Sequence, residues 1–224
     1  MNYSELYNYL FSIRDLKFME FSKTISNSTY EVIGVKTPIL KDLVKKHFND
    51  NELILKDFIL GKYLEIDYLY YAINLKRLND IKQQLSFISE EIKNAKSWAI
   101  TDMITTYIKK YDFDIYYDFF KKSYKSKYLY ERRMAYVLGL KLYKDKNILK
   151  ILKHIQLNEE YMVMMSEAWL LQVIGLEYPN DVYDYLSDID DITLKRKTIS
   201  KICDSRRVPL ELKDKFKNLR NNIE

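Results

Sequence analysis

Glycine, proline and cysteine are all scarce in this chain of 224 residues, which has four glycines, three prolines and one cysteine. A β-rich fold, or an α/β fold with a glycine-rich phosphate loop, would need more turn residues than these. Neither a GxGxxG nor a GxxxxGK[ST] pattern occurs, which disfavours the nucleotide-binding enzymes that depend on such loops. We therefore expect an all-α fold.

Metal ligands and disulfide partners are equally scarce. Cys203 is the single cysteine, so it can form neither an internal disulfide nor a cysteine-based metal site, and it suits a reducing cytosol. His47 and His154 are far apart in sequence and no HExxH motif occurs, which disfavours a metalloenzyme. We expect no metal, no other cofactor and a cytoplasmic location.

Long hydrophobic runs are missing as well. The first residues do not form a basic region followed by an apolar segment, as a signal peptide would. No stretch reaches the roughly 18 uncharged apolar residues that a membrane span needs, so we expect none. The net charge of +5 permits binding to a polyanion, although AT-biased coding could account for much of the lysine.

Apolar residues recur at helical spacing almost from end to end. One helix is predicted from Tyr3 to about Lys23, and another begins within Gly34-Val35-Lys36-Thr37-Pro38. There Thr37 is the expected N-cap and Pro38 the first helical residue. Further helices are predicted over residues 52–60, 63–78, 79–93, 97–110, 114–123, 128–143, 147–155, 159–176, 180–187, 192–203 and 209–222.

The joins between these helices are short, which predicts one continuous domain over residues 1–224. Trp98, Arg133 and Trp169 are 35 and 36 residues apart, close to one HEAT-like helix pair per step. Equivalent points on successive repeats face one concave surface. The expected fold is an all-α solenoid of HEAT-like antiparallel helix pairs with a concave face.

The stretch Lys96-Ser97-Trp98-Ala99-Ile100-Thr101-Asp102 lies in mid-chain between two apolar helical patterns. In a helix, Trp98 and Asp102 share one face, so a large aromatic ring lies one turn from a carboxylate. Such a pair can stabilise positive charge, the ring by cation–π attraction and the carboxylate by Coulomb attraction. Taken alone, the pair fits a core tryptophan and a solvated helix acid better.

Two further features have both a functional and a structural interpretation. Arg132 and Arg133 begin a mostly apolar helix, where they could bind phosphate oxygens or simply lie on the surface. Trp169 lies in an aliphatic helix, where a core position is its simplest explanation. Basic clusters recur at helix ends and would form a stripe for duplex phosphates if they line the concave face, or a solvated outer face otherwise. They are Lys109-Lys110, Lys121-Lys122 with Lys125 and Lys127, Lys195-Arg196-Lys197 with Lys201, and Arg206-Arg207.

In order and spacing, these segments together resemble the DNA alkylation-repair glycosylases of the AlkD type, which are all-helical HEAT-like solenoids. The resemblance covers about residues 3–203. The matching features are a Gly-x-x-x-Pro helix start at Gly34 to Pro38, an aromatic-plus-acid catalytic helix at Trp98 and Asp102, an arginine-bearing helix at Arg132-Arg133, and a second aromatic wall at Trp169, ten residues before Pro179.

The chain also departs from the family pattern. The family often has an acidic or aromatic residue beside the first tryptophan, whereas Ser97 and Ala99 are small here. Small residues at these two positions could loosen the pocket or change the range of substrates. The spacing from Trp98 to Asp102 is intact, so catalysis is still expected.

The resemblance implies a DNA glycosylase of base excision repair that hydrolyses the N-glycosidic bond of cationic N3- or N7-alkylated purines without base flipping. Asp102 would stabilise the oxocarbenium charge that grows on the sugar, and Trp98 and Trp169 would form an aromatic cleft around the deoxyribose. The expected partner is double-stranded DNA containing alkylated bases, bound by a monomer. The expected DNA-binding residues are Arg133, Arg132, Lys96, Lys36, Lys195 and Arg196.

Two other functions remain open from the sequence. A non-catalytic relative that senses DNA damage or shapes DNA would share the basic face but release no base. A HEAT-type scaffold that binds a protein partner would bind DNA weakly, with no preference for lesions, and would have its lysines and arginines scattered.

Overall fold

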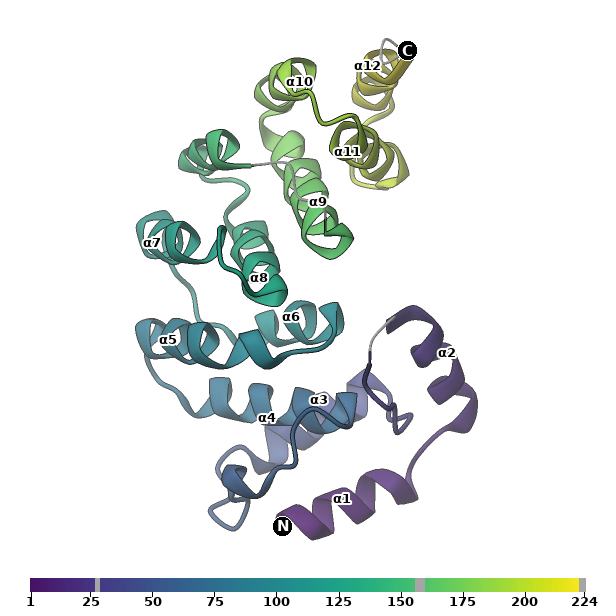
Figure 1. Cartoon of the computed structure of the whole chain (residues 1–224), viewed down its shortest axis with the longest axis vertical. Helices are drawn as coiled ribbons and strands as arrows, with labels where there is room; N and C mark the ends of the chain where they lie inside the picture. Colours follow the sequence, from purple (N-terminus) through teal and green to yellow (C-terminus); the bar gives the residue numbers. More distant parts are fainter. Residues whose placement is uncertain (27–28, 156–159, 222–224) are drawn as a thin grey trace. The chain divides into compact units, whose positions relative to one another are not determined.

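The structure, a computed structural model, describes residues 1–26, 29–155 and 160–221 (Figure 1). Within these ranges the regular secondary structure is helical, together with an isolated β-bridge between Glu31 and Tyr63, so the predicted all-α class is confirmed. No helix in these ranges is long and apolar enough to cross a membrane. The chain divides into two compact units, Met1–Tyr111 and Asp112–Glu224.

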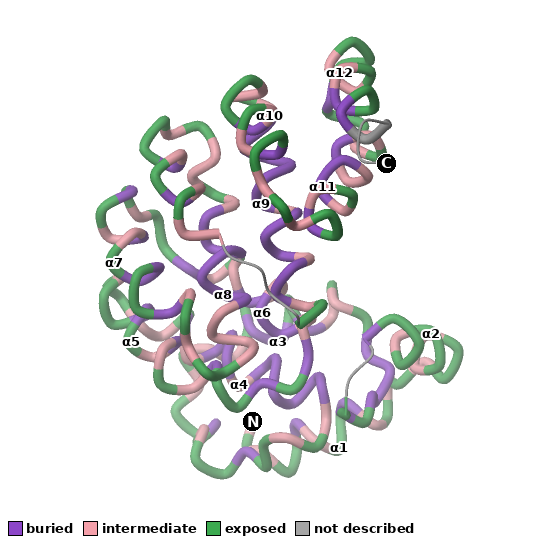
Figure 2. The backbone as a smooth tube through the Cα atoms, turned by 45° about the horizontal axis from the view of Figure 1, so that its top comes forward, coloured by how far each residue is buried: buried purple, intermediate pink, exposed green. Residues whose placement is uncertain are grey.

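The first unit is built around helix α4, which packs against α3 and α6. Ten of its residues between Leu64 and Leu75 are buried, and Figure 2 shows this helix as a largely buried segment. The elements of the unit are α1 (Tyr3–Ser12), α2 (Leu16–Ser26), α3 (Thr37–His47), the 3-10 turn Leu55–Asp57, α4 (Leu64–Arg77), α5 (Ile81–Glu91), the 3-10 turn Ile92–Asn94, α6 (Trp98–Ile104) and the 3-10 turn Thr105–Tyr107.

The single helix predicted over residues 3–23 is wrong, because the chain breaks it into α1 and α2. Asp15 sits at the break. Its backbone N–H donates to the carbonyl oxygen of Gly34 at 3.0 Å, and its Oδ1 accepts from the Phe18 N–H at 3.0 Å. The carboxylate thus satisfies a backbone donor in the first turn of α2, while the backbone bond ties the break to a distant segment.

Two other local predictions are wrong. The helix expected over residues 52–60 shrinks to the turn Leu55–Asp57. The Arg77 side chain donates to three carbonyl oxygens of the preceding loop, which holds that loop in a non-helical path; these belong to Phe48, Asp50 and Leu53.

The N-cap of α3 is Lys36 rather than Thr37, and Pro38 is the second helical residue. Lys36 has the extended backbone of a cap residue but makes no side-chain cap bond. The Thr37 hydroxyl instead contacts the sulfur of Met103 on α6 at 4.0 Å.

The second unit stacks helix pairs in two layers. Helix α9 packs against α8, α10 and α11, and it is apolar on all sides, as a central buried helix should be. Figure 1 shows α8, α9 and α11 along one side of this unit and α7, the 3-10 segment and α10 along the other. The elements are α7 (Phe113–Ser123), α8 (Leu129–Gly139), the 3-10 turn Leu140–Leu142, the 3-10 segment Lys146–His154, α9 (Tyr161–Glu177), α10 (Pro179–Asp188), α11 (Ile192–Asp204) and α12 (Leu210–Asn221).

Gly34 holds a position that only glycine tolerates, and its substitution gives a stability prediction. Its φ is +102°, and a Cβ atom there would lie 2.6 Å from the Asp15 carbonyl oxygen and 2.9 Å from the Met19 Cβ. We expect Gly34→Ala to destabilise the protein by about 2–5 kcal/mol, because backbone strain and overlap add. The melting temperature should fall by roughly 5–15 °C in a thermal denaturation experiment.

Gly175, within α9, is the matched control for this substitution. A Cβ there would meet Val182 at ordinary contact distances of 3.7–3.9 Å, and alanine has a higher helix propensity than glycine. Gly175→Ala should keep or raise the melting temperature. If the two variants had the same melting temperature, the close approach of Gly34 to Asp15 would not affect stability.

Candidate functional site

Helix α6 begins at Trp98 because Ser97 caps it. Ser97 is buried and has an extended backbone, and its Oγ accepts from the Ala99 N–H at 3.2 Å. This places Trp98 as the first residue of the helix and Asp102 one turn later, both half-buried. The aromatic ring and the carboxylate therefore start from the same face of one helix, as their spacing predicts.

The Asp102 carboxylate lies beside a hydroxyl group. Thr101 Oγ1 is 3.0 Å from Asp102 Oδ1 and 2.7 Å from the carbonyl oxygen of Trp98. A hydroxyl has one proton, so Thr101 can donate to only one of these oxygens at a time. Because Thr101 is buried and α6 packs on α4, the backbone that carries Asp102 is held by the core of the first unit.

Trp98 also lines a cavity of about 280 Å³ formed by residues of α2, α3, α4 and α6 with the segments beside them. Its lining is mostly apolar, and Ala99 belongs to it, so a larger residue at that position would fill space that is now open. The lining residues are Phe18, Ser22, Ile25, Ser26, Val35, Thr37, Leu40, Leu64, Glu65, Trp98, Ala99 and Met103.

A buried carboxylate, which the sequence analysis missed, fixes one wall of this cavity. Glu65 is 3% exposed, and its two oxygens accept the backbone N–H groups of three consecutive residues. These are Ile33 at 2.9 Å, Gly34 at 2.8 Å and Val35 at 3.2 Å. An acid inside the apolar run that starts at Leu64 was the available sequence signal, since such acids are rarely buried without partners.

A second buried acid of α4 organises the neighbouring loop. Asp67 accepts from the Tyr30 hydroxyl at 2.6 Å and from the Gly61 N–H at 2.8 Å, and burial raises the pKa of its carboxyl group above the usual range. Lys96 joins the same cluster, with its Nζ donating to the Gly61 carbonyl oxygen at 2.7 Å. The exposed Lys96 side chain thus already has a partner in the protein, and its contact with DNA remains a prediction.

Lys36, another predicted DNA contact, is exposed and forms an ion pair of 3.0 Å with Asp15. The Phe18 N–H and then the Lys36 ammonium group lower the pKa of the Asp15 carboxyl. An exposed pair of this kind contributes little stability, so Lys36 could exchange Asp15 for a phosphate at small cost.

In the second unit, Arg133 and Trp169 lie on α8 and α9, two helices that pack together. Arg133 is only 5% exposed, and its Nη1 donates to the Met162 carbonyl oxygen at 2.6 Å. Arg132 is half-buried and forms an ion pair with Glu160. Both arginines thus hold the beginning of α9, and a phosphate-binding role for either remains a prediction.

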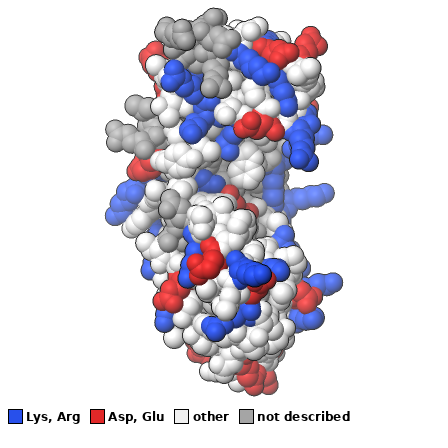
Figure 3. Space-filling model, turned by 90° about the vertical axis from the view of Figure 1, so that its right-hand side faces the viewer, with Lys and Arg blue, Asp and Glu red and all other residues white. Residues whose placement is uncertain are grey.

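The remaining predicted residues lie on α9 and α11. Trp169 is half-buried on α9. On α11, Arg196 is exposed, and Lys195 Nζ lies 3.4 Å from the Ser187 carbonyl oxygen. On the face shown in Figure 3, lysine and arginine side chains are interspersed with acidic ones.

Glu167, two residues before Trp169, is fully buried and was also missed from the sequence. Burial and then the Glu167 carboxylate raise the pKa values of the Tyr136 and Tyr185 hydroxyls. The sequence signal was the same as for Glu65, an acid inside an apolar helix.

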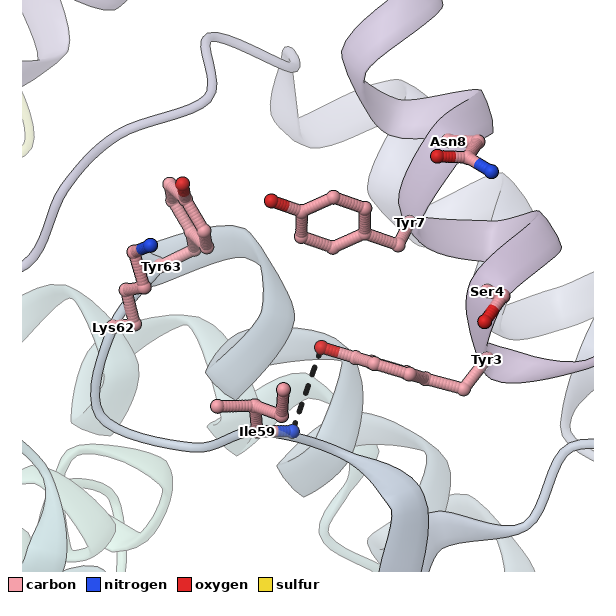
Figure 4. Close-up of a pocket in the computed structure, with 7 residues that line it drawn as sticks. All are labelled: Tyr3, Ser4, Tyr7, Asn8, Ile59, Lys62 and Tyr63. Carbon is pink, nitrogen blue, oxygen red and sulfur yellow. Dashed lines mark hydrogen bonds between the residues drawn. The ribbon is translucent and has the colours of Figure 1, made fainter.

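A second cavity, of about 250 Å³, lies between α1 and the loop that leads into α4, and no predicted site residue lines it (Figure 4). The Tyr7 ring points from α1 toward Tyr63, and the Tyr63 hydroxyl, together with burial, raises the pKa of Tyr7 to about 12. The Tyr3 hydroxyl accepts from the Ile59 N–H at 3.4 Å. These contacts attach α1 to the unit.

Comparison with known proteins adds two findings. The family model described as DNA alkylation repair enzyme matches residues 10–202. A solved structure described as "Predicted DNA alkylation repair enzyme from Enterococcus faecalis" is similar, with a TM-score of 0.65 and 15% sequence identity, covering 86% of this chain and 98% of that one. At such identity the likeness shows the fold alone. No curated protein matches the chain.

Proposed function

Because the chain belongs to the DNA alkylation repair enzyme family, we propose that it is a DNA glycosylase that removes cationic N3- or N7-alkylated purines from duplex DNA. Family membership supports a role in alkylation repair, and one structural observation supports the finer proposal. Trp98 lines a cavity at the start of α6, and the half-buried Asp102 carboxylate follows one turn later. An aromatic ring beside an anion favours a site that stabilises positive charge.

The chemistry needs little beyond such stabilisation. Alkylation gives the purine a positive charge, so it leaves with the bonding electrons as a neutral base and needs no added proton. Positive charge then develops on the sugar as an oxocarbenium ion, and water adds at C1′ with loss of a proton to leave an abasic site. The Asp102 carboxylate would stabilise that charge and orient the water, which is often the largest catalytic contribution.

The remaining proposed residues bind rather than react. The Trp98 ring would attract the cationic lesion by about 0.5–2 kcal/mol, and Trp169 is a further aromatic contact to the sugar. Arg132, Arg133, Lys96, Lys36, Lys195 and Arg196 are the proposed phosphate contacts. No step requires the damaged base to rotate out of the duplex, unlike most enzymes that act on bases.

The proposal is tested by incubating the protein with methylated duplex DNA and measuring the free bases by liquid chromatography. We expect release of 7-methylguanine and 3-methyladenine with an equal number of abasic sites, and no release from unmethylated DNA. Tight binding without release would favour a non-catalytic damage-binding protein. If the protein neither bound DNA nor released a base, a scaffold that binds a protein partner would be the remaining function.

A further inference from the structure

A cluster of basic and aromatic side chains lies on α7, the two residues that follow it and the 3-10 segment Lys146–His154, outside the proposed site. The Tyr117 hydroxyl and the His154 Nε2 are 2.9 Å apart, which joins the two elements. We call the cluster the α7 platform and define it as Tyr117, Lys121, Tyr124, Lys125, Lys153 and His154.

Positive charge dominates the α7 platform. Desolvation and then the charges of Lys153, Lys125 and Lys121 lower the pKa of His154. The only acid paired with these lysines among the described residues is Asp118, in an exposed ion pair of 3.0 Å with Lys121. An exposed pair is weak and can open when a phosphate competes for the lysine.

Aromatic rings alternate with these charges. The Lys121 Nζ lies 4.9 Å from the centre of the Tyr117 ring, and the Lys125 Nζ lies 5.3 Å from that of Tyr124. Both tyrosines are half-buried, and Tyr124 stacks on the buried Phe120 with ring centres 5.0 Å apart. The packed core therefore holds the Tyr124 ring in place beside an exposed lysine.

The α7 platform lies on a different layer of the second unit from the predicted site residues. Arg133 and Trp169 belong to α8 and α9, whereas α7 and the Lys146–His154 segment lie along the other side (Figure 1). The residues of the α7 platform therefore lie on a different layer from Arg133 and Trp169.

We propose that the α7 platform is a second nucleic-acid site, one that binds single-stranded DNA. Proteins that bind single-stranded nucleic acids combine fixed aromatic rings with neighbouring lysines. The bases stack on the rings, and the phosphates bind the ammonium groups. A duplex offers phosphates but keeps its bases stacked on each other, so it would leave the tyrosine rings unused. The site goes beyond the proposed base excision, and its test does not depend on that activity.

The two histidines of the chain give a direct readout of binding. The pKa of each imidazole can be measured by NMR, with and without an oligothymidylate of about a dozen nucleotides, which matches typical single-strand site sizes. Phosphates that bind beside Lys121, Lys125 and Lys153 should raise the pKa of His154. His47, which lies in the first unit beside Asp50, should not change.

A triple variant and a matched control locate the binding energy. Lys121→Gln, Lys125→Gln and Lys153→Gln together should weaken oligothymidylate binding at least tenfold and reduce its log–log salt slope by about 2. The control removes three exposed lysines of the first unit instead, through Lys41→Gln, Lys82→Gln and Lys93→Gln. It changes the net charge equally but keeps the platform lysines, so it should weaken binding less than threefold.

The outcomes separate this site from the proposed function. A rise in the His154 pKa with selective loss in the platform variant supports the proposal, whether or not the wild type releases base. If base release occurs but the His154 pKa is unmoved by oligothymidylate, the α7 platform is not a binding site. Equal losses in the two triple variants would likewise overturn it, since only net charge would then matter.

Discussion

Asp102→Asn should lower the rate of 7-methylguanine release by about 100- to 1,000-fold, the range seen when one preorganised electrostatic group is removed from an active site. Asparagine has the same shape as aspartate, and its carbonyl oxygen can still accept from Thr101, which lies 3.0 Å from Asp102 Oδ1. Only the negative charge opposite the developing oxocarbenium ion is lost. Single-turnover release from methylated duplex, with enzyme in excess, measures that loss directly.

Binding separates a catalytic role of Asp102 from a structural one. The variant should bind methylated DNA as tightly as the wild type does, because the uncharged amide repels phosphates less than the carboxylate. Asp184→Asn, which neutralises an exposed acid on α10, is the control and should keep the wild-type rate. Parallel loss of binding and release by Asp102→Asn, or a lower melting temperature, would make Asp102 a structural residue.

The helices were largely predictable because their signals are local. Apolar residues at helical spacing located α4, α7, α9 and α11 within a few residues, and the Trp98–Asp102 pair depends only on the geometry of one helical turn. The break between α1 and α2 was not predictable in this way. It depends on the bond between the Asp15 N–H and the Gly34 carbonyl oxygen, which joins segments far apart in sequence.

The environment of the candidate site was harder to predict for the same reason. Arg133 begins α8 in a pattern that fits a surface arginine, yet the approach of α9 buries it against the Met162 carbonyl oxygen. Glu65 and Glu167 interrupt apolar runs, so their burial left a trace in the sequence. The sequence gives no sign of their partners. Those of Glu65 are backbone N–H groups of a loop that is remote in sequence.

Glu65→Gln should cause a large loss of stability, because Glu65 accepts three buried backbone hydrogen bonds. Oε1 of Glu65 accepts from Gly34 and Val35, while Oε2 accepts from Ile33. Glutamine keeps one oxygen, and its amide group would then point a donor at a backbone donor. One buried N–H would lose its partner and the charge-assisted bonds would weaken, at a cost of about 2–4 kcal/mol. The melting temperature should fall by roughly 5–15 °C.

The loss of these hydrogen bonds should also loosen the wall of the cavity beside Trp98, because both Glu65 and Val35 line it. Amide hydrogen exchange of Ile33, Gly34 and Val35 should therefore accelerate in Glu65→Gln, even below the melting transition, since one of these N–H groups loses its acceptor and the bonds of the others weaken. Glu177→Gln, at the exposed end of α9, changes the same atoms without a buried partner and should leave stability unchanged. If exchange at those three residues were unaltered, the carboxylate would not be what holds this wall of the cavity.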